Sequence, residues 1–384
     1  MEARVQIDRF VVSNFRSISH CEVEFSPLTV FIGRNAAGKT SFVGAMQFVA
    51  AALQDSLQKA IRYKGGVHSI LRHAAVLPAS LRFAFFVSSG DGFQAEFHLE
   101  LGVAEGWVLS VRREECSVLE PGGIRHHYVV EDGRVTGSAA IFPSVSVDRV
   151  FLANASGLPE FRRIFDFLAG LASCEPTLPG VHVALQQSQR LLRALDSGSA
   201  DPVSLASRFR ALVLHYPERL EIIHQYLRAI APPFYRIDVV EANDTLWLRF
   251  LDKSDAGVET PFLLSLASAG LVHSADILLE LFEPPKPGQS ASPVVVEEPE
   301  ALLHPGAIQV LRDAFIEASV FRQVIVTTHS PEFLDDGSIP AESIRVVHRD
   351  DAGTHIEPLE SATQSIIRDQ LYTAGQLLRQ GALV

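Results

Sequence analysis

The chain of 384 residues, 47% of them hydrophobic and 20% charged, is long enough for one large domain or two to three ordinary domains with a sizeable core. Its formal net charge of −12 argues against a protein that coats nucleic acid over its whole surface, but it leaves a local basic face and DNA or RNA binding open. The charged start of the chain lacks the apolar stretch of a signal peptide, and the longest apolar run, residues 263–282, is interrupted by ionisable side chains. We therefore expect a cytoplasmic protein with no membrane association, and the scattered Cys21, Cys116 and Cys174 indicate reduced thiols.

The chain opens with predicted strands and a phosphate-binding motif. Residues 5–12 are dense in β-formers, residues 22–25 alternate polar and apolar side chains, and residues 28–32 form an apolar run typical of a buried strand. Residues 33–40 match the P-loop pattern G-x-x-x-x-G-K-[ST] in full. Apolar side chains then recur at the spacing of one helix face, at Phe42, Met46, Val49, Leu53 and Leu57. Strand, glycine loop and helix in this order predict a site for a nucleoside triphosphate.

Each residue type in the P-loop has a chemical task. Gly33 and Gly38 let the backbone curl so that its N–H groups point at phosphate oxygens, and the positive end of the following helix faces the same anion. Lys39 places a positive charge at the β- and γ-phosphates, and the Thr40 hydroxyl is a ligand for Mg²⁺. The residues predicted to hold ATP here are Gly33, Arg34, Asn35, Ala36, Ala37, Gly38, Lys39, Thr40 and Ser41.

The middle of the chain changes from strand patterns to helix patterns. Short β-rich runs between residues 81 and 130, separated by glycine turns, predict an antiparallel meander, which we place beside the P-loop strand in the same lobe. Helical stripes then extend over residues 158–230, and one of them consists of Leu185, Leu192 and Leu195. A hairpin of residues 235–240 and 245–251, joined by Asn243 and Asp244, follows.

A second motif supplies the carboxylates that phosphoryl transfer requires. Residues 294–296 predict a buried strand, and Glu297 and Glu298 follow at its carboxyl end, where α/β sheets bind ligands. We assign Glu297 to Mg²⁺ and its water shell, and Glu298 to polarising the attacking water. The simpler interpretation is that two glutamates end a strand, and the P-loop in the same chain disfavours it.

A histidine ends the next predicted strand. Pro305 is suited to start a helix, residues 323–328 form another buried strand, and His329 comes directly after it. A lone histidine is more often structural, but His329 at the carboxyl end of a strand beside a nucleotide would donate a hydrogen bond to the γ-phosphate. Its place in this ordered set of motifs favours the catalytic role. Beyond His329 we expect a hairpin and one helix.

These motifs resemble those of the ABC-type ATPase domains of the RecF/SMC/OLD class, and the OLD-like group in particular. The segments that carry the resemblance are residues 14–18, 297–305, 327–331 and 372–378. The resemblance implies an α/β P-loop NTPase fold of the ABC-ATPase type, with a mixed central sheet, an antiparallel β subdomain and a helical second lobe. The expected domains are an N-terminal ATPase lobe (1–150), a helical subdomain (151–233) and a C-terminal ATPase lobe (234–384).

The resemblance also assigns roles to three further residues. Ser268 and Gly270 are similar to the signature motif, which contacts the γ-phosphate of ATP bound to the opposite subunit, although Leu271 stands where an acidic or polar residue is usual. Without the resemblance, Ser268 is an ordinary helix cap. Arg16 is a candidate contact to the nucleotide or to the paired subunit, or else a plain surface arginine. The class implies that two subunits close head-to-tail around two ATP molecules and reopen on hydrolysis.

The function expected from this resemblance is an ATP-driven switch in bacterial genome maintenance or anti-phage defence. The chain ends 55 residues after His329, so we expect no Toprim-type nuclease domain and a separate effector protein, for which a nuclease is the candidate. A RecF-like repair ATPase that binds DNA directly is the alternative, weakened by the acidic charge. The 258 residues from Lys39 to Glu297 disfavour the nucleotide-binding subunit of a transporter, and the presence of Glu298 favours slow hydrolysis over a non-hydrolysing scaffold.

Overall fold

The computed structural model describes residues 4–72, 80–104, 107–131, 133–138, 142–145, 149–174, 205–242, 245–263 and 266–383. The predicted stripe of Leu185, Leu192 and Leu195 and the predicted Asn243-Asp244 turn lie outside these ranges. Contacts between residues divide the chain into two compact units. Unit 1 comprises Met1–Ser173, Pro285–Val295 and Ser319–Val384, and unit 2 comprises Cys174–Pro284 and Val296–Ala318. The three consecutive domains of the sequence analysis stay a prediction.

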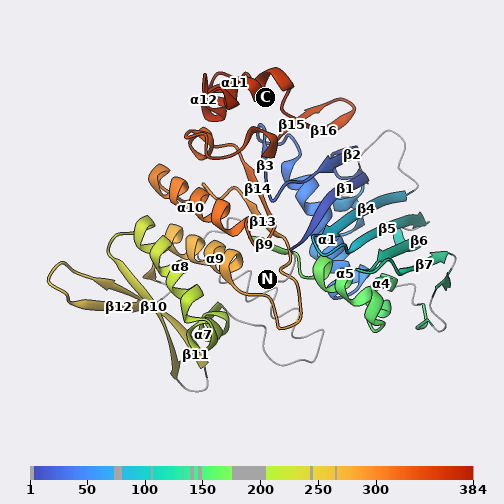
Figure 1. Cartoon of the computed structure of the whole chain (residues 1–384), viewed down its shortest axis with the longest axis horizontal. Helices are drawn as coiled ribbons and strands as arrows, with labels where there is room; N and C mark the ends of the chain where they lie inside the picture. Colours follow the sequence, from blue (N-terminus) through green and yellow to red (C-terminus); the bar gives the residue numbers. More distant parts are fainter. Residues whose placement is uncertain are drawn as a thin grey trace. The chain divides into compact units, whose positions relative to one another are not determined.

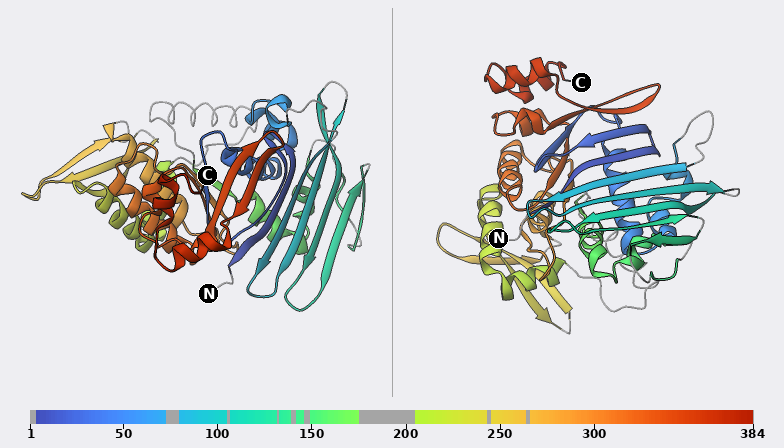
Figure 2. Two further views of the ribbon diagram at one scale, coloured as in Figure 1. Left: turned by 90° about the horizontal axis from the view of Figure 1, so that it is seen from above. Right: turned by 45° about the vertical axis from the view of Figure 1, so that its right-hand side comes forward.

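Unit 1 contains a seven-stranded sheet in which every neighbouring pair is antiparallel. Its strands run side by side in Figures 1 and 2. In spatial order they are β2 (Ile18–Glu24), β1 (Val5–Phe15), β4 (Ser80–Ser89), β5 (Gln94–Ala104), β6 (Val108–Leu119), β7 (Arg125–Glu131) and β8 (Arg134–Gly137). The predicted meander is therefore confirmed, but its expected place beside the P-loop strand is wrong, because β4 pairs with β1 in a sheet of its own.

The P-loop strand belongs to a second sheet of six strands. In spatial order they are β16 (Gly353–Pro358), β15 (Ile344–Asp350), β3 (Leu28–Ile32), β14 (Val324–Thr328), β13 (Val294–Glu297) and β9 (Ala172–Cys174). Both β14 and β15 run parallel to β3, while β16 is antiparallel to β15, so the sheet is mixed as expected. All residues of β3 and β14 are buried, which explains why these strands read as continuous apolar runs.

The helices of unit 1 include the helix that follows the P-loop. They are α1 (Lys39–Gln54), α2 (Leu57–Tyr63), α3 (Val67–Ile70), α4 (Phe151–Ala155), α5 (Pro159–Ala169), α11 (Ser361–Arg368) and α12 (Ala374–Arg379). The ring of Phe42 in α1 lies 5.4 Å from Phe10 of β1 and 5.2 Å from Phe31 of β3, so α1 packs against both sheets. Leu57, predicted on the same helix, instead begins α2, because Ser56 caps a new helix by accepting a hydrogen bond from the Lys59 amide.

Unit 2 combines four helices with a small antiparallel sheet in the described part of its sequence. The helices are α7 (Leu205–His215), α8 (Pro217–Ile230), α9 (Ala269–Phe282) and α10 (Pro305–Ala318), and the strands are β10 (Phe234–Ala242), β11 (Thr245–Lys253) and β12 (Glu259–Leu263). The predicted hairpin is confirmed as β10 and β11, and β12 was not predicted. Arg208 of α7 forms ion pairs with Glu280 and Glu283 at the end of α9, which ties the two helices together.

The residues after His329 differ from the sequence analysis. The predicted hairpin is present as β15 and β16, but two helices, α11 and α12, follow it where one was expected. The helix α12 begins with a capping box in which Thr373 and Gln376 satisfy each other's backbone N–H groups. Gly375 lets α12 approach the carbonyl oxygen of Pro331 at the start of a 3₁₀ turn, η2 (Pro331–Leu334), shortly after His329.

A buried carboxylate joins α4 to the seven-stranded sheet. Glu114 of β6 is completely buried and accepts hydrogen bonds from the Tyr128 hydroxyl (2.7 Å) and from the backbone N–H groups of Phe151 (2.6 Å) and Leu152 (2.7 Å). The first turn of a helix has such N–H groups unsatisfied, and Glu114 supplies their partner. Burial disfavours the charged form and raises the pKa of Glu114 to about 7, although the three hydrogen bonds act in the opposite direction.

We expect the stability of the protein to fall as the pH rises through this titration. Between the unfolded pKa of 4.5 and the folded value of about 7, the folded chain keeps a proton that the unfolded chain has lost. Deprotonation of Glu114 then removes about 3 kcal/mol from the free energy of unfolding. Urea unfolding at both ends of this window should show the loss in the wild type and a smaller loss in Glu114→Gln. Equal losses in the two proteins would contradict the assignment.

Candidate nucleotide-binding site

The P-loop joins the end of β3 to the start of α1 within unit 1. The strand ends at Ile32, the helix begins at Lys39, and Gly38 is the N-cap residue with φ of +115°. That backbone angle lies in the region that favours glycine. Ala36 also has a positive φ, of 65°, so the loop turns sharply between the two predicted glycines.

Both glycines of the motif are required by close neighbours from the C-terminal hairpin. A Cβ atom on Gly33 would overlap the carbonyl oxygen of Val347 in β15, and a Cβ atom on Gly38 would overlap the side chain of Thr354 in β16. A side chain at either position would therefore collide with the hairpin and displace the loop. Val347 and Thr354 were not predicted, and nothing in their local sequence marks them as neighbours of the P-loop.

The start of α1 is suited to an anion. Its first turn contains no acidic residue, and Gly38 offers no side chain to cap it, so phosphate oxygens would be the natural partners of its N–H groups. The ammonium group of Lys39 donates hydrogen bonds to the carbonyl oxygens of Gly33 (2.7 Å) and Arg34 (3.2 Å) and is folded over the loop. Thr40 is exposed in this first turn. The cradle, the helix start and Lys39 together fit the triphosphate of a nucleotide, with Thr40 available to Mg²⁺.

The strand register brings His329 to the same edge of the sheet as the P-loop. Thr328, the last residue of β14, is paired with Ile32, the last residue of β3, and the two strands are parallel. Gly33 and His329 therefore leave neighbouring strands at the same end, where α/β sheets bind ligands. The side chain of His329 is exposed, whereas Ser330 is buried and its amide donates to the Thr328 hydroxyl at 3.0 Å.

The predicted carboxylates lie at the end of β13. Glu297 is its last residue and is buried, and Glu298 follows with a positive φ of 43°. Such an angle costs a non-glycine residue about 1–2 kcal/mol, and glycine would avoid this cost. The position nevertheless holds a carboxylate side chain. The strand order places β13 next to β14. Among the described residues, no group of three or more His, Cys, Asp or Glu side chains is placed to hold a metal ion.

The signature-like residues lie at the start of α9 in unit 2. Ser268 is the N-cap residue, and its hydroxyl accepts a hydrogen bond from the Leu271 amide at 3.3 Å, as the local pattern predicts. A Cβ atom on Gly270 would lie 2.7 Å from the carbonyl oxygen of Leu302, which follows β13. Gly270 therefore has a packing role inside unit 2, and Ser268 remains exposed.

Arg16, the other residue named from the resemblance, lies in the turn between β1 and β2 with φ of 50°. Its side chain donates a hydrogen bond to the carbonyl oxygen of Ser69 at 3.3 Å, and its guanidinium group approaches Gly44 of α1. Arg16 is thus packed near the P-loop helix in unit 1.

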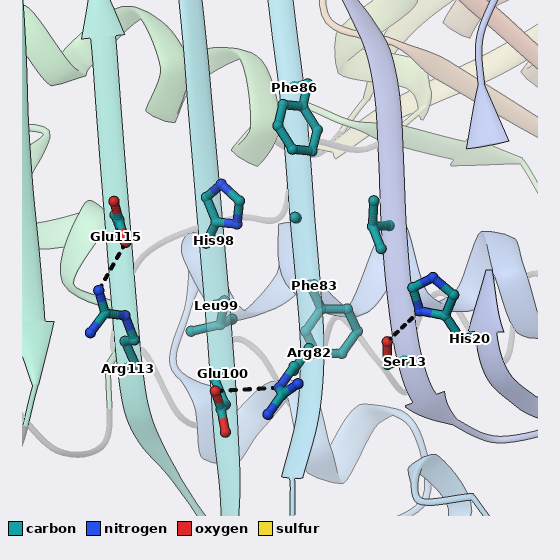
Figure 3. A pocket seen from close by; sticks show the side chains of 12 residues that line it. Ser13, His20, Arg82, Phe83, Phe86, His98, Leu99, Glu100, Arg113 and Glu115 are labelled. Atoms are coloured by element: carbon teal, nitrogen blue, oxygen red, sulfur yellow. Dashed lines mark hydrogen bonds and ion pairs between the residues drawn. The ribbon is translucent and has the colours of Figure 1, made fainter. Parts of the chain in front are cut away.

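A hollow of about 420 Å³ lies elsewhere in unit 1, on one face of the seven-stranded sheet (Figure 3). The figure shows that its walls come from neighbouring strands, with Arg82 pairing with Glu100 and Arg113 pairing with Glu115 across them. The charged groups at its rim are therefore largely neutralised by one another. The hollow lacks the backbone cradle and the helix start that make the P-loop suitable for phosphate.

Comparisons with known proteins agree with this geometry. Residues 6–79 match the family model "AAA ATPase domain", and residues 186–335 match the family model "AAA domain, putative AbiEii toxin, Type IV TA system". The DNA replication and repair protein RecF of Streptococcus thermophilus is 32% identical over 89 residues, which are 20% of this chain and 24% of the relative. The chain therefore matches about a quarter of the length of this relative.

Solved structures extend the likeness to nearly the whole chain. An SMC head bound to the C-winged helix domain of ScpA is 14% identical and superimposes with a TM-score of 0.51, covering 93% of this chain and 99% of that one. An SMC head with an extended coiled coil, bound to the C-terminal domain of ScpA from Pyrococcus furiosus, is 12% identical with the same TM-score. The two ATPase family models, the partial RecF match and the SMC-head fold together support an ABC-type ATPase of the RecF/SMC-like class. The expected α/β fold of this class is thereby confirmed. In the described parts of this RecF/SMC-like chain, every helix is too short or too polar to cross a membrane.

Proposed function

We propose that this RecF/SMC-like protein binds Mg·ATP, hydrolyses it slowly, and uses the nucleotide to switch between an open and a closed arrangement of two copies. The observation that carries the proposal is the P-loop itself, where a glycine cradle, the uncapped start of α1 and the buried Lys39 converge. The bound Mg²⁺ would neutralise charge on the β- and γ-phosphates. Thr40 and Glu297 are the residues we propose to hold it and its water shell.

The proposed hydrolytic residues are Glu298 and His329. Glu298 polarises the attacking water, and His329 donates a hydrogen bond to the γ-phosphate. Support comes from the order of strands β3, β14 and β13, because each of them is followed at its end by one of the proposed motifs. The exposure of His329 and the strained backbone of Glu298 fit groups that face a ligand and not the core.

The closed state is proposed to be a head-to-tail dimer in which each P-loop faces Ser268 and Gly270 of the partner copy. The exposed position of Ser268 at the start of α9 supports this, because a helix start there would offer a second set of N–H groups to the γ-phosphate. One matching family is described as "AAA domain, putative AbiEii toxin, Type IV TA system", and the solved SMC heads carry a bound ScpA domain. Both support a role with a separate effector protein in defence or genome maintenance, and a nuclease is the candidate effector.

Light scattering coupled to size exclusion tests the switch. Wild-type protein with Mg·ATP should elute with twice the molar mass that it has without nucleotide, because ATP supplies contacts to both copies. If ATP binds but the mass stays constant, the ATP-driven dimer is wrong and the nucleotide acts within an existing assembly or a single copy.

Direct DNA binding is the second candidate function, and the RecF match favours it. Duplex DNA labelled with a fluorophore should then bind in the presence of ATP. The logarithm of its binding constant should fall linearly with the logarithm of the salt concentration. Binding that is insensitive to ATP or to salt would contradict this candidate.

A further inference from the structure

The P-loop is anchored from behind by a chain of three hydroxyl groups. Thr354 of β16 is completely buried, and its Oγ1 lies 3.0 Å from the carbonyl oxygen of Ala37 and 2.8 Å from Oγ of Ser17. Oγ of Ser17 lies in turn 2.9 Å from Oγ of Ser41 in the first turn of α1. The three hydroxyl groups therefore connect Ser41, in the first turn of α1, with the carbonyl group of Ala37 in the P-loop.

The number of hydroxyl protons fixes which group donates and which accepts in each of these hydrogen bonds. The carbonyl oxygen of Ala37 accepts but cannot donate, so the single hydroxyl proton of Thr354 must point to it. Ser17 must then donate to Thr354, and Ser41 must donate to Ser17. Every hydroxyl in the chain is used once as a donor, and the Ala37 carbonyl receives the last proton.

The orientation of one peptide plane follows from this anchor. In a trans peptide the C=O and the next N–H point in opposite directions. Holding the Ala37 carbonyl on Thr354 therefore turns the N–H of Gly38 away from β16. Without the anchor, rotation of this peptide would present the negative end of the carbonyl dipole to a bound phosphate, which repels it.

The backbone at Thr354 is held independently of its hydroxyl group. Its amide donates to the carbonyl oxygen of Ser17 at 2.9 Å, and the residue is paired with Arg349 in the register of β15 and β16. The absence of a side chain at Gly38 is what allows the close approach of Thr354. Removing the hydroxyl alone should therefore leave the hairpin in place and release the Ala37 carbonyl and the Ser17 hydroxyl.

We propose that Thr354 is a positioning residue of the nucleotide site, which fixes the Ala37–Gly38 peptide so that the Gly38 N–H binds a phosphate oxygen. The inference rests on the proposed binding of ATP at the P-loop. It adds that the C-terminal hairpin is part of the apparatus that sets the affinity for phosphate.

Three variants test the role of the hydroxyl. Thr354→Val keeps the shape and removes the donor, Thr354→Ser keeps the donor, and Thr29→Val removes a buried hydroxyl at the far end of β3, where Thr29 is bonded to Ser26. With Mg²⁺ and fluorescent MANT-ADP as the probe, Thr354→Val should bind about tenfold more weakly than wild type, the cost of one lost buried hydrogen bond. Thr354→Ser should bind within about twofold of wild type. Thr29→Val should lower the melting temperature without changing the affinity.

The outcomes separate this inference from the proposed function. If the wild type binds MANT-ADP and Lys39→Ala does not, nucleotide binding at the P-loop stands. Equal affinities of wild type and Thr354→Val would then overturn the positioning role alone, as would equal losses in Thr354→Val and Thr354→Ser. A wild type that does not bind the probe would overturn the proposed function.

Discussion

Replacing Lys39 with alanine is expected to weaken the binding of Mg·ATP by about a hundredfold, because truncating one partner of a buried, hydrogen-bonded charge pair costs about 2–5 kcal/mol. The loss should be large because the ammonium group is almost buried beside the loop, where water screens its charge only weakly. Its present partners, the carbonyl oxygens of Gly33 and Arg34, are neutral and would be exchanged for phosphate oxygens. Isothermal titration calorimetry with ATP measures the effect.

Lys59→Ala is the matched control for this experiment. Lys59 is a lysine of the next helix, α2, and forms an ion pair with Asp55 at 3.8 Å. Its removal changes the net charge by the same amount as Lys39→Ala but leaves the P-loop intact, so the affinity for ATP should change less than about twofold. A similar loss in both variants would mean that charge alone attracts the nucleotide, and the specific role of Lys39 would be wrong.

Replacing Glu298 with glutamine is expected to preserve ATP binding and to slow hydrolysis by about 10²–10⁴-fold, because an amide cannot act as a base toward the attacking water. The substitution keeps the size of the side chain and the positive φ of the backbone. ATP would then remain unhydrolysed, and the proposed closed dimer would persist long after the wild-type dimer has reopened. Phosphate release and light scattering on the same samples measure the rate and the lifetime.

Glu317→Gln provides the comparison for Glu298→Gln. Glu317 belongs to α10 in the same unit, and its carboxylate accepts a hydrogen bond from the Tyr226 hydroxyl at 2.6 Å. It lies outside the proposed catalytic motifs and is bonded to Tyr226, so the hydrolysis rate should match that of wild type. If Glu298→Gln also hydrolyses ATP at the wild-type rate, Glu298 does not activate the water, and another group must be sought.

The two variants should have different effects on nucleotide binding, on hydrolysis and on the dimer. Lys39→Ala should lose nucleotide binding and the dimer together, whereas Glu298→Gln should lose turnover and prolong the dimer. A dimer that forms in Lys39→Ala on addition of ATP would show that closure does not depend on the P-loop.

The sequence alone determined the features that depend on neighbouring residues. The P-loop, the helix that Ser268 caps and the carboxylates at the end of β13 were all located from local patterns. Such patterns are informative because a glycine turn, a helix cap and a buried strand are each specified within a few residues. The antiparallel meander was recognised for the same reason.

Only the tertiary structure decided which distant segments meet. The meander pairs with β1 and not with β3, and a partner for the first helical N–H groups of α4 comes from Glu114 in β6. Thr354 reaches the Ala37 carbonyl from the other end of the chain. No local pattern encodes these contacts, because strand pairing and burial are set by the combined packing of many apolar side chains across the whole unit. The residues of the P-loop can thus be predicted from the sequence. The groups that fix the conformation of the loop are identified only in the tertiary structure.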